Sequence, residues 1–355
     1  MLETHGWNAA LQHDFVPHAA TGLIAGRVIL QQRGLYGLAT QLGELRGQIA
    51  GRLAREAEAG GYPAAGDWVA LAPGGPGETA VIHHVLARRT AFTRKAAGSA
   101  GGMQVVAANI DVAFVVAAMD GDFNPRRLER YLAAAWQSGA APVVVLTKAD
   151  LAADVVGAVA AAEAAAPGVP VLAISSPTGR GLEVVRGHLA PGLTGVMVGP
   201  SGAGKSTLLN ALVGAERMAT GAVREADGRG RHTTSHRELI VLPGGGLLLD
   251  TPGMRELGLW ESDAGVSATF HDIEILAARC RFGDCGHTNE PGCAVRAALE
   301  SGLLDADRWR AFGKLRRELA FVEAKENPAL RAVRRRRWIE ITKAQRSGKR
   351  LRGKD

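Results

Sequence analysis

Short apolar runs separated by glycine occupy residues 22–95. Four of them predict β-strands, at Leu23–Leu30, Leu35–Thr40, Asp67–Ala72 and Ala80–Leu86. Short strands with Gly turns and no long helical pattern are typical of a small barrel. We therefore expect an OB-fold here, a class that often binds nucleic acid, although an SH3-like barrel has the same pattern. Residues 1–21 show little periodicity and are expected to form an amino-terminal extension.

After the small, Gly-rich segment Ala96–Gly102, which predicts a linker, apolar runs alternate with helical segments. The runs lie at Val112–Ala118, Pro142–Leu146, Val169–Ile174 and Gly195–Val198. Helices are expected between them, one beginning at Asn124 and Pro125, the others over Ala152–Ala166 and Gly181–Leu189. Continuous apolar strands are typical of a parallel sheet covered on both faces. Residues 96–258 thus predict a doubly wound α/β domain whose ligands lie at the carboxyl ends of the strands.

A phosphate-binding loop follows the last of these runs. It consists of Gly199, Pro200, Ser201, Gly202, Ala203, Gly204, Lys205 and Ser206, after which Thr207 continues into an expected helix. A glycine-rich loop between a strand and a helix presents backbone amides to phosphate oxygens. We expect Lys205 to reach the β- and γ-phosphates and Ser206 to bind Mg²⁺.

Further residues expected at the metal and the γ-phosphate follow this loop. Asp250, after the apolar run Leu247–Leu249, is expected to hold Mg²⁺ through water, with the Gly253 amide at the γ-phosphate. The glycine-rich, charged stretch Gly228–Ser235 predicts a switch, and within it we favour Thr234 over its neighbour as the residue that completes the Mg²⁺ shell.

The residue that orients the attacking water is harder to assign. Met254 replaces the glutamine that Ras-like enzymes use, and a thioether offers no useful hydrogen bond. His232 is the candidate for this role, and a solvent-facing switch histidine is an equally good interpretation. The candidate catalytic residues are therefore Lys205, Thr234 and His232.

The residues expected to recognise the base come before the phosphate loop in the chain. They are Thr147, Lys148, Ala149 and Asp150, followed by Ser175 and Ser176, which are expected to place a backbone amide near guanine O6. The Asp150 carboxylate can accept hydrogen bonds from guanine N1 and N2, which adenine does not offer, so GTP is predicted over ATP. The usual motif has Asn in place of Thr147, and the shorter hydroxyl is expected to cost affinity. Because base-reading residues normally follow the phosphate loop, the domain is predicted to be circularly permuted.

All three cysteines of the chain lie in one short segment with a histidine. The set Cys280, Cys285, His287 and Cys293 supplies three thiolates and one imidazole, which suffice for a closed tetrahedral zinc site. Since no position is left for water, the predicted Zn²⁺ is structural, one per chain. Residues 259–330 are expected to form a small, mostly helical domain that depends on this metal.

The net charge of +7 is concentrated at the carboxyl end. Residues 331–355 hold eleven Lys or Arg against two acidic residues, with Trp338 beside the run Arg334–Arg337. Such a tail can neutralise phosphates and stack an aromatic ring on a base, so RNA is the expected partner. A solvated tail without a partner is the alternative.

Taken together, the order TKAD, ISS, GPSGAGKST, RHTTS, DTPG and CRFGDCGHTNEPGC resembles the RsgA (YjeQ) family of small-ribosomal-subunit-dependent GTPases over nearly the whole chain. The resemblance implies an amino-terminal OB-fold, a permuted GTPase domain, a zinc domain, and a role in late maturation of the small subunit in the bacterial cytoplasm. The segment Val105–Asp111, with Asn109 and Asp111, is similar to the family's entry into the GTPase domain.

The resulting hypothesis is a slow GTPase that binds the 30S subunit and 16S rRNA and that the subunit stimulates, cycling between GTP and GDP. Two alternatives remain: an RNA-binding module with a vestigial nucleotide site, and an ATP-dependent RNA remodelling enzyme. The sequence has no run of about 18 apolar residues and no export signal around Glu3, His5 and Asp14, so a cytoplasmic protein without membrane contact is expected. No coiled-coil repeat is evident, and a monomer is expected.

Overall fold

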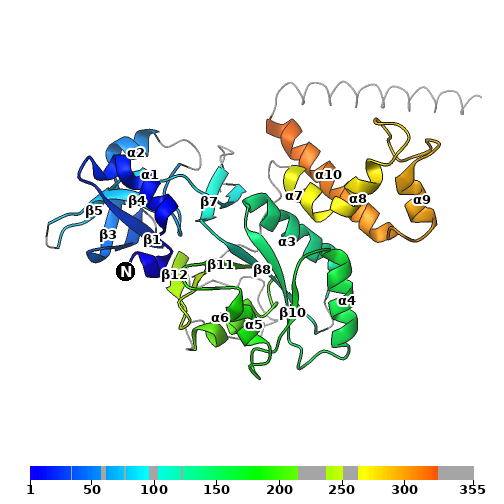
Figure 1. The fold of residues 1–355 in the computed structure, drawn as a ribbon, viewed down its shortest axis with the longest axis horizontal. Helices are drawn as coiled ribbons and strands as arrows, with labels where there is room; N and C mark the ends of the chain where they lie inside the picture. Colours follow the sequence, from blue (N-terminus) through cyan, green and yellow to red (C-terminus); the bar gives the residue numbers. More distant parts are fainter. Residues whose placement is uncertain are drawn as a thin grey trace, which may run out of the picture. The chain divides into compact units, whose positions relative to one another are not determined.

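The computed structural model describes most of the chain, in eight segments. They are residues 1–32, 34–56, 61–75, 77–95, 103–120, 123–214, 237–250 and 263–326. The chain forms two compact units, Met1–Gly258 and Leu259–Asp355 (Figure 1). Within the described segments, no helix is both long and apolar enough to cross a lipid bilayer.

The first unit begins with a small barrel. Its strands are β1 (Ile24–Gln32), β2 (Leu35–Thr40), β3 (Gly43–Ile49), β4 (Trp68–Ala72) and β5 (Ala80–Val85), and a short helix, α2 (Gly51–Glu56), follows β3. They pair in the order β1-β2-β3-β5-β4, and β4 returns to pair with β1. The interior contains fully buried apolar side chains, among them Val28, Leu38, Val69 and Ile82. This five-stranded arrangement confirms the OB-like barrel.

The amino-terminal residues are helical, which their sequence pattern did not indicate. A single 3-10 turn, η1 (Glu3–His5), precedes helix α1 (Ala9–Ala19), whose first turn is capped by Asn8 through a 3.1 Å bond from the Leu11 amide. Only Leu11 and Phe15 of α1 are buried, packed with Trp68 of the barrel. Two apolar positions one turn apart are too few to produce a recognisable helical period.

The rest of the first unit is an α/β sheet. Its strands are β8 (Val112–Ala118), β9 (Ala141–Thr147), β10 (Val171–Ala173), β11 (Thr194–Val198), β12 (Arg237–Val241) and β13 (Leu247–Asp250). The order is β10-β9-β8-β11-β13-β12, parallel except for β12. Apolar residues of α3 (Pro125–Ser138) and α4 (Val155–Ala165) pack on one face, and those of α5 (Leu182–Gly187) and α6 (Lys205–Val213) on the other. The predicted α/β layers are confirmed.

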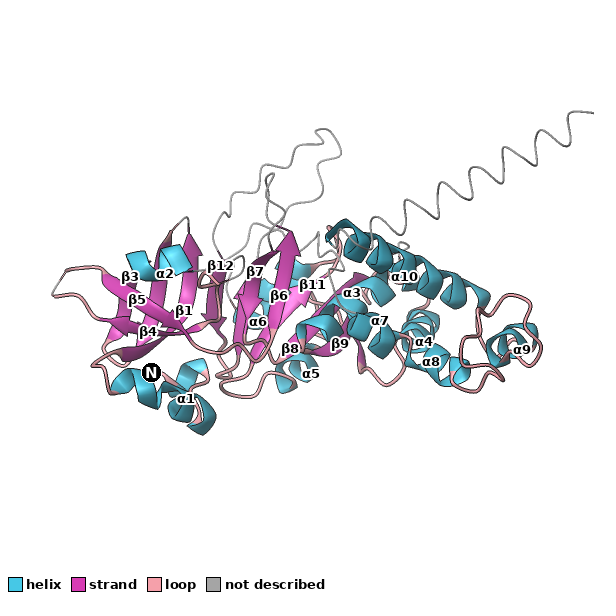
Figure 2. Cartoon of the chain, turned by 90° about the horizontal axis from the view of Figure 1, so that it is seen from above, coloured by secondary structure: helices cyan, strands magenta, loops and turns pink. Residues whose placement is uncertain are grey.

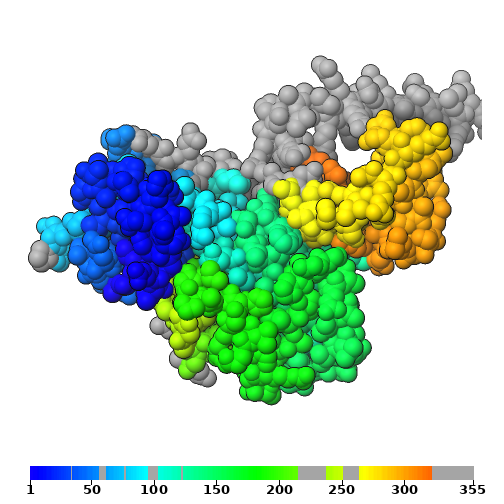
Figure 3. Space-filling view, in the orientation of Figure 1, coloured from blue at the N-terminus to red at the C-terminus, as the bar shows by residue number. Residues whose placement is uncertain are grey.

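The barrel and the α/β sheet share one continuous sheet of 11 strands, because β1 pairs with the edge strand β12. Figure 2 shows the strands running from the barrel through β12 toward β11 and β8, and Figure 3 shows the two parts of this unit packed against each other. A separate antiparallel pair, β6 (Ala91–Lys95) and β7 (Met103–Ala108), leads from the barrel into β8. The predicted linker Ala96–Gly102 falls between these two strands, outside the described residues.

The second unit is mostly helical, as expected. It contains α7 (Asp263–Thr269), α8 (His271–Ala277), α9 (Ala294–Glu300) and α10 (Ala306–Glu326). The fully buried side chains of Val266, Phe270, Ile273 and Val295 lie among these helices. Arg308 of α10 is 5% exposed and donates to both carboxylate oxygens of Asp272 (2.9 and 2.7 Å). The same guanidinium donates to the Thr269 carbonyl (2.9 Å), so one side chain joins three helices.

Candidate functional site: a phosphate loop and a thiolate cluster

The predicted phosphate loop joins the end of β11 to the start of α6. Its first residue, Gly199, has φ 149°, and a Cβ built there would lie 2.2 Å from the Val116 carbonyl oxygen of β8. Only glycine fits this close approach. At the other end, Gly204 (φ 83°) precedes the helix, and its carbonyl accepts from the Leu208 amide (2.9 Å). The loop therefore has the strand-to-helix setting that anion binding requires.

Lys205 begins α6, and its ammonium group is held over the loop. Nζ donates to the carbonyl oxygens of Gly199 (2.8 Å) and Pro200 (2.6 Å). Ser206 and Thr207 lie in the same first helical turn. These neutral acceptors fix the lysine where phosphate oxygens, which are stronger acceptors, can replace them.

Thr147 connects the residues predicted to recognise the base to the predicted phosphate loop. It ends β9, is 2% exposed, and its hydroxyl donates to the Ala203 carbonyl at 2.8 Å. The Ala117 carbonyl lies 3.3 Å from the same Oγ1, but a hydroxyl has a single proton, so the shorter contact is the one made. The hydroxyl of Thr147, although shorter than the asparagine side chain of the usual motif, thus reaches the loop.

Lys148, the next residue, has a left-handed backbone (φ 62°) and pairs with Asp120. Both side chains are about one-third exposed, at 30% and 32%. Asp120 follows β8 just as Asp150 follows β9, so the same signal, an acidic residue after an apolar run, could have identified it. The sequence analysis did not single it out.

The segment that carries the two predicted serines lies beside the motif Thr147–Asp150. The Ala149 amide donates to the Ile174 carbonyl (3.0 Å), which places the end of β10 next to Asp150. Ser175 is 1% exposed, and its amide donates to the Arg180 carbonyl (3.0 Å). Of the two serines, Ser176 is therefore the better candidate to offer an amide to a base.

The predicted metal aspartate lies at the same edge of the sheet. Parallel pairing sets Val196 of β11 opposite Leu249 of β13, so Asp250, the last residue of β13, lies beside the strand that carries the phosphate loop. The other candidates of this group, Gly253, Thr234 and His232, lie outside the described residues.

A cavity of about 230 Å³ adjoins the loop on the α3 side. Its lining includes Asp120, Lys148, Arg127 and Tyr131, together with Pro200–Ala203, but not Asp150 or Lys205. It thus borders part of the predicted phosphate loop and Lys148, one of the residues predicted to contact the base. Burial raises the pKa of Tyr131 above the ordinary value of a phenol.

The second unit brings together all four predicted metal ligands. Their ligand atoms lie within 4.8 Å of one another and could hold a metal ion. His287 Nδ1 is 3.6 Å from Cys280 Sγ and 3.5 Å from Cys293 Sγ, and the two sulfur atoms are 3.9 Å apart. Ligand atoms about 2.3 Å from a metal in tetrahedral geometry lie about 3.8 Å apart, so the donor set fits a tetrahedral ion.

The loop that carries His287 is ordered by the carboxylate of Glu290. Its oxygens accept from the backbone amides of Gly286 (3.0 Å), Thr288 (2.8 Å) and Asn289 (3.0 Å). Bonds from the backbone amides of Glu290 itself, then Thr288 and its neighbours, lower the pKa of Glu290 to about 2. His287 has φ 57°, and its ring meets Trp309 edge-on at 5.6 Å. Glu290 was not singled out from sequence, although it lies between two ligands.

Comparisons with known proteins match these features. The family model described as RsgA GTPase matches residues 85–260. A protein of Opitutus terrae named small ribosomal subunit biogenesis GTPase RsgA is 46% identical over 363 residues, covering 99% of each chain. A Streptomyces avermitilis protein of the same name is 47% identical over 340 residues, covering 95% of this chain and 90% of its own.

Two solved structures share the fold. The crystal structure of YjeQ from Thermotoga maritima has a TM-score of 0.63 and 25% identity, and the match covers 84% of this chain and 98% of that one. YloQ, described as a circularly permuted GTPase, has a TM-score of 0.60 and 24% identity over 85% of this chain and 96% of its own.

The bond between Thr147 and the phosphate loop predicts a nucleotide-binding phenotype. Thr147→Ala leaves the buried Ala203 carbonyl without its donor, which costs about 1–3 kcal/mol. We expect guanine nucleotides to bind at least about fivefold more weakly by fluorescence titration with a labelled GDP. Thr147→Ser keeps the hydroxyl and should bind almost as the parent does; equal affinity in the alanine variant would contradict this role.

The Glu290 bonds predict a change in metal affinity. Glu290→Ala frees the His287 loop, and loss of such a supporting group typically lowers metal affinity about 10–100-fold. We expect weaker Zn²⁺ binding in a competition titration with a chromophoric chelator, with the metal content at saturation unchanged. Glu300→Ala is the control, because Glu300 is exposed on α9 and pairs only locally with Arg296. A parent-like affinity in Glu290→Ala would refute the ordering role.

Proposed function

This chain belongs to the RsgA GTPase family, and we propose that it hydrolyses GTP in the biogenesis of the small ribosomal subunit. The observation that carries the proposal is the 2.8 Å bond from Thr147 to Ala203. It joins the base-reading residues to the phosphate loop although the chain meets them in reversed order. This chain aligns with almost the whole length of these relatives. Their names support the ribosomal role.

In the proposed complex the Asp150 carboxylate accepts from guanine N1 and N2, the Lys148 stem lies along the base, and the Ser176 amide donates to guanine O6. The Asp120–Lys148 ion pair supports this arrangement, because it holds the lysine at the base-reading edge. The loop amides and Lys205 bind the phosphates. The donor set of Ser206 and Asp250 suits Mg²⁺, which supplies charge neutralisation at the β- and γ-phosphates when bound.

For hydrolysis we assign roles to residues beyond the described segments. Thr234 would help to hold Mg²⁺, the Gly253 amide would contact the γ-phosphate, and His232 would orient the attacking water. Met254 stands where Ras-like enzymes have glutamine, which supports a slow reaction in the free protein. Contact with the subunit then orders the switch and accelerates hydrolysis.

Docking on 16S rRNA is assigned to the barrel, the second unit and the basic tail. The charge of residues 331–355, with eleven basic side chains, supports an electrostatic attachment to RNA phosphates. The thiolate-rich ligand set supports one structural Zn²⁺ per chain rather than a catalytic metal. We place the protein in the cytoplasm, where ribosomes assemble, and propose that it acts as a monomer.

The assignment of the base predicts a change of nucleotide preference. Asp150→Asn removes a charged acceptor of two hydrogen bonds, which is expected to weaken GTP binding about a hundredfold or more. Xanthosine triphosphate, whose base presents an oxygen where guanine has an amino group, should bind the variant better than GTP does. Competition titrations with GTP, ATP and xanthosine triphosphate measure this. Unchanged GTP preference in the variant would exclude Asp150 as the base reader.

The proposed function is tested by single-turnover GTP hydrolysis with and without small ribosomal subunits. We expect the subunits to raise the rate by at least about tenfold, since ordering one catalytic group contributes 10²–10⁴-fold in typical sites. Lys205→Ala is the inactive control, and large subunits control for nonspecific RNA. Co-sedimentation at rising salt should show attachment weakening steeply. Equal rates with and without small subunits would refute the stimulation, and binding indifferent to nucleotide would favour the vestigial alternative.

A further inference from the structure

Strand β1 belongs to two structures at once. Within the barrel it pairs with β4 over Ile24–Arg27 and with β2 over most of its length. Its last residues pair with β12, the edge strand of the α/β sheet, with Leu30 opposite Glu238 and Gln31 opposite Arg237. A register shift between Val28 and Leu30 separates the two halves. The first half of the strand, here called the barrel half, pairs within the barrel alone. The second half pairs both with β2 of the barrel and with β12 of the α/β sheet.

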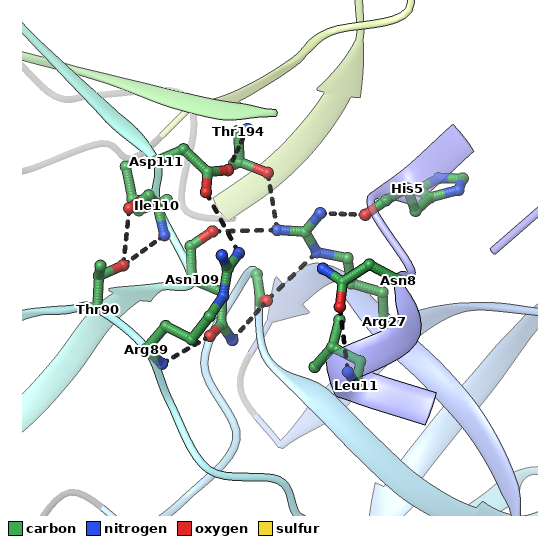
Figure 4. A network of polar contacts seen from close by, with 11 residues as sticks. His5, Asn8, Leu11, Arg27, Arg89, Thr90, Asn109, Ile110, Asp111 and Thr194 are labelled. Carbon is green, nitrogen blue, oxygen red and sulfur yellow. Dashed lines mark hydrogen bonds and ion pairs between the residues drawn. The ribbon is translucent and has the colours of Figure 1, made fainter. Parts of the chain in front are cut away.

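The barrel half carries a buried arginine that points into the α/β domain (Figure 4). Arg27 is 2% exposed, and Nη2 donates to Thr194 Oγ1 at 2.8 Å, while Nη1 donates to the His5 carbonyl. Longer bonds of 3.3 Å reach the carbonyls of Gly66 and Asn109. Burial lowers the pKa of Arg27 to about 10, so the group remains charged at neutral pH. A buried charge of this kind fixes its acceptors in place, because losing one is costly.

Thr194 is the first residue of β11, the strand that leads into the phosphate loop. Its amide donates to Asp111 Oδ2 (2.8 Å) at the start of β8, and Asp111 also pairs with Arg89 (3.2 Å). The Asn109 side chain donates to the Gly66 carbonyl (3.2 Å) and accepts from the Arg89 amide (3.1 Å). The amino ends of the two central strands are thus tied to one another and to the barrel.

Two pairs of backbones approach too closely at this junction for any side chain. A Cβ on Gly6 would lie 2.5 Å from the Gly192 carbonyl oxygen, and one on Gly66 would lie 2.2 Å from that of Ala108. Both glycines have left-handed backbones, with φ 89° and 91°. Such close packing leaves little room for the barrel to shift without moving the α/β strands.

The other end of β1 lies in line with Asp250, the predicted metal ligand. Leu30 pairs with Glu238 of β12, and Glu238 pairs with Asp250 of β13, so these three residues lie in line across the sheet. The Arg237 guanidinium donates to Gln31 Oε1 (2.7 Å), which adds a side-chain contact beside this line. Strand β1 therefore contacts the first residue of β11, the strand that leads into the phosphate loop. It also pairs with Glu238, the residue opposite the predicted metal ligand Asp250.

We propose that β1 mechanically couples the barrel to the nucleotide site, with Arg27 and Thr194 as the positioning pair that transmits the position of the barrel to β11. Occupation of the phosphate loop shifts or stiffens β11 and β13, and the junction passes this change to the barrel. Because coupling between two sites is reciprocal, a ligand on the barrel alters the nucleotide site by the same free energy. That this ligand is the small subunit rests on the proposed function; the coupling itself does not.

Hydrogen exchange of the full-length protein tests the coupling without ribosomes. Amide exchange is followed in peptides that cover β1 and β4, with and without a nonhydrolysable GTP analogue and Mg²⁺. In the parent we expect the analogue to slow exchange in these barrel strands. Thr194→Val keeps the shape of the side chain but removes the acceptor for Arg27, and it should reduce this nucleotide-dependent difference at least about fivefold, the lower end of typical coupling between sites.

Matched variants separate coupling from loss of stability. Thr194→Ser keeps the hydroxyl and should behave as the parent does. Thr40→Val removes another fully buried hydroxyl, one that donates to Gly43 within the barrel (2.8 Å), and should leave the difference intact. Gln31→Met removes the contact with Arg237 at the other end of β1 and provides a second test if Thr194→Val does not fold. No nucleotide effect in the parent barrel, or a parent-like effect in both coupling variants, would overturn the proposal.

Stimulation by small subunits provides the second readout. In Thr194→Val the rate increase caused by small subunits should be at least about fivefold smaller than in the unsubstituted protein. Its basal rate and its affinity for GTP should stay within about twofold of those of the unsubstituted protein. Stimulation that survives in Thr194→Val and Gln31→Met contradicts the coupling. If subunits do not stimulate the parent while its barrel responds to nucleotide in hydrogen exchange, the proposed function fails and the coupling stands.

Discussion

Parallel pairing in register between β9, β8, β11 and β13 is the constraint on which the predicted nucleotide site depends. Each of these strands ends at the same edge of the sheet, so Thr147, Gly199 and Asp250 converge there whatever their order in the chain. Backbone hydrogen bonds and buried apolar side chains set the register between the strands. This register does not depend on the order in which loops join the strands. This explains how a permuted chain can build the site of an ordinary GTPase: permutation changes which loops join the strands, and leaves the edge on which their ends lie unchanged.

Features that depend on residues close together in the sequence were predictable. The apolar runs of β8 and β9, the cap and proline at the start of α3, the phosphate loop and the four-ligand cluster all follow from local pattern or spacing, and the structure contains them. Helix α1 was missed because it buries few side chains. Strand β3 was missed although exposed polar residues, Glu44, Arg46 and Gln48, alternate along it with less exposed positions, a pattern typical of a half-buried strand.

The junction could not have been predicted in the same way. Asn109 and Asp111 stood out only by resemblance, since the residues they contact are remote in sequence: Arg27 lies 82 positions from Asn109, and the Asp111–Thr194 bond spans 83. Nothing local in Leu23–Leu30 indicates that its arginine points out of the barrel into another domain. Similarly, the pairing of β1 with β12 consists of two residue pairs at the end of β1, Leu30 with Glu238 and Gln31 with Arg237, and so short a contact leaves no composition signal. Long-range polar contacts are visible only in three dimensions.

Burying Arg27 is energetically unfavourable when each bond is considered alone. Its partners within hydrogen-bond distance are neutral carbonyls and a hydroxyl, and full desolvation of a cation costs several kcal/mol. The carboxylates of Asp111 and Asp67 and the Trp68 ring, 5.2 Å from the guanidinium, offset part of this cost. A methionine of similar volume would avoid the penalty, yet it could not hold four acceptors from the extension, the barrel, the segment before β8 and the start of β11 in fixed positions. The arginine therefore fixes the positions of these four groups more than it adds to net stability. Fixed positions are what β1 requires, because this strand is shared by the barrel and the α/β sheet.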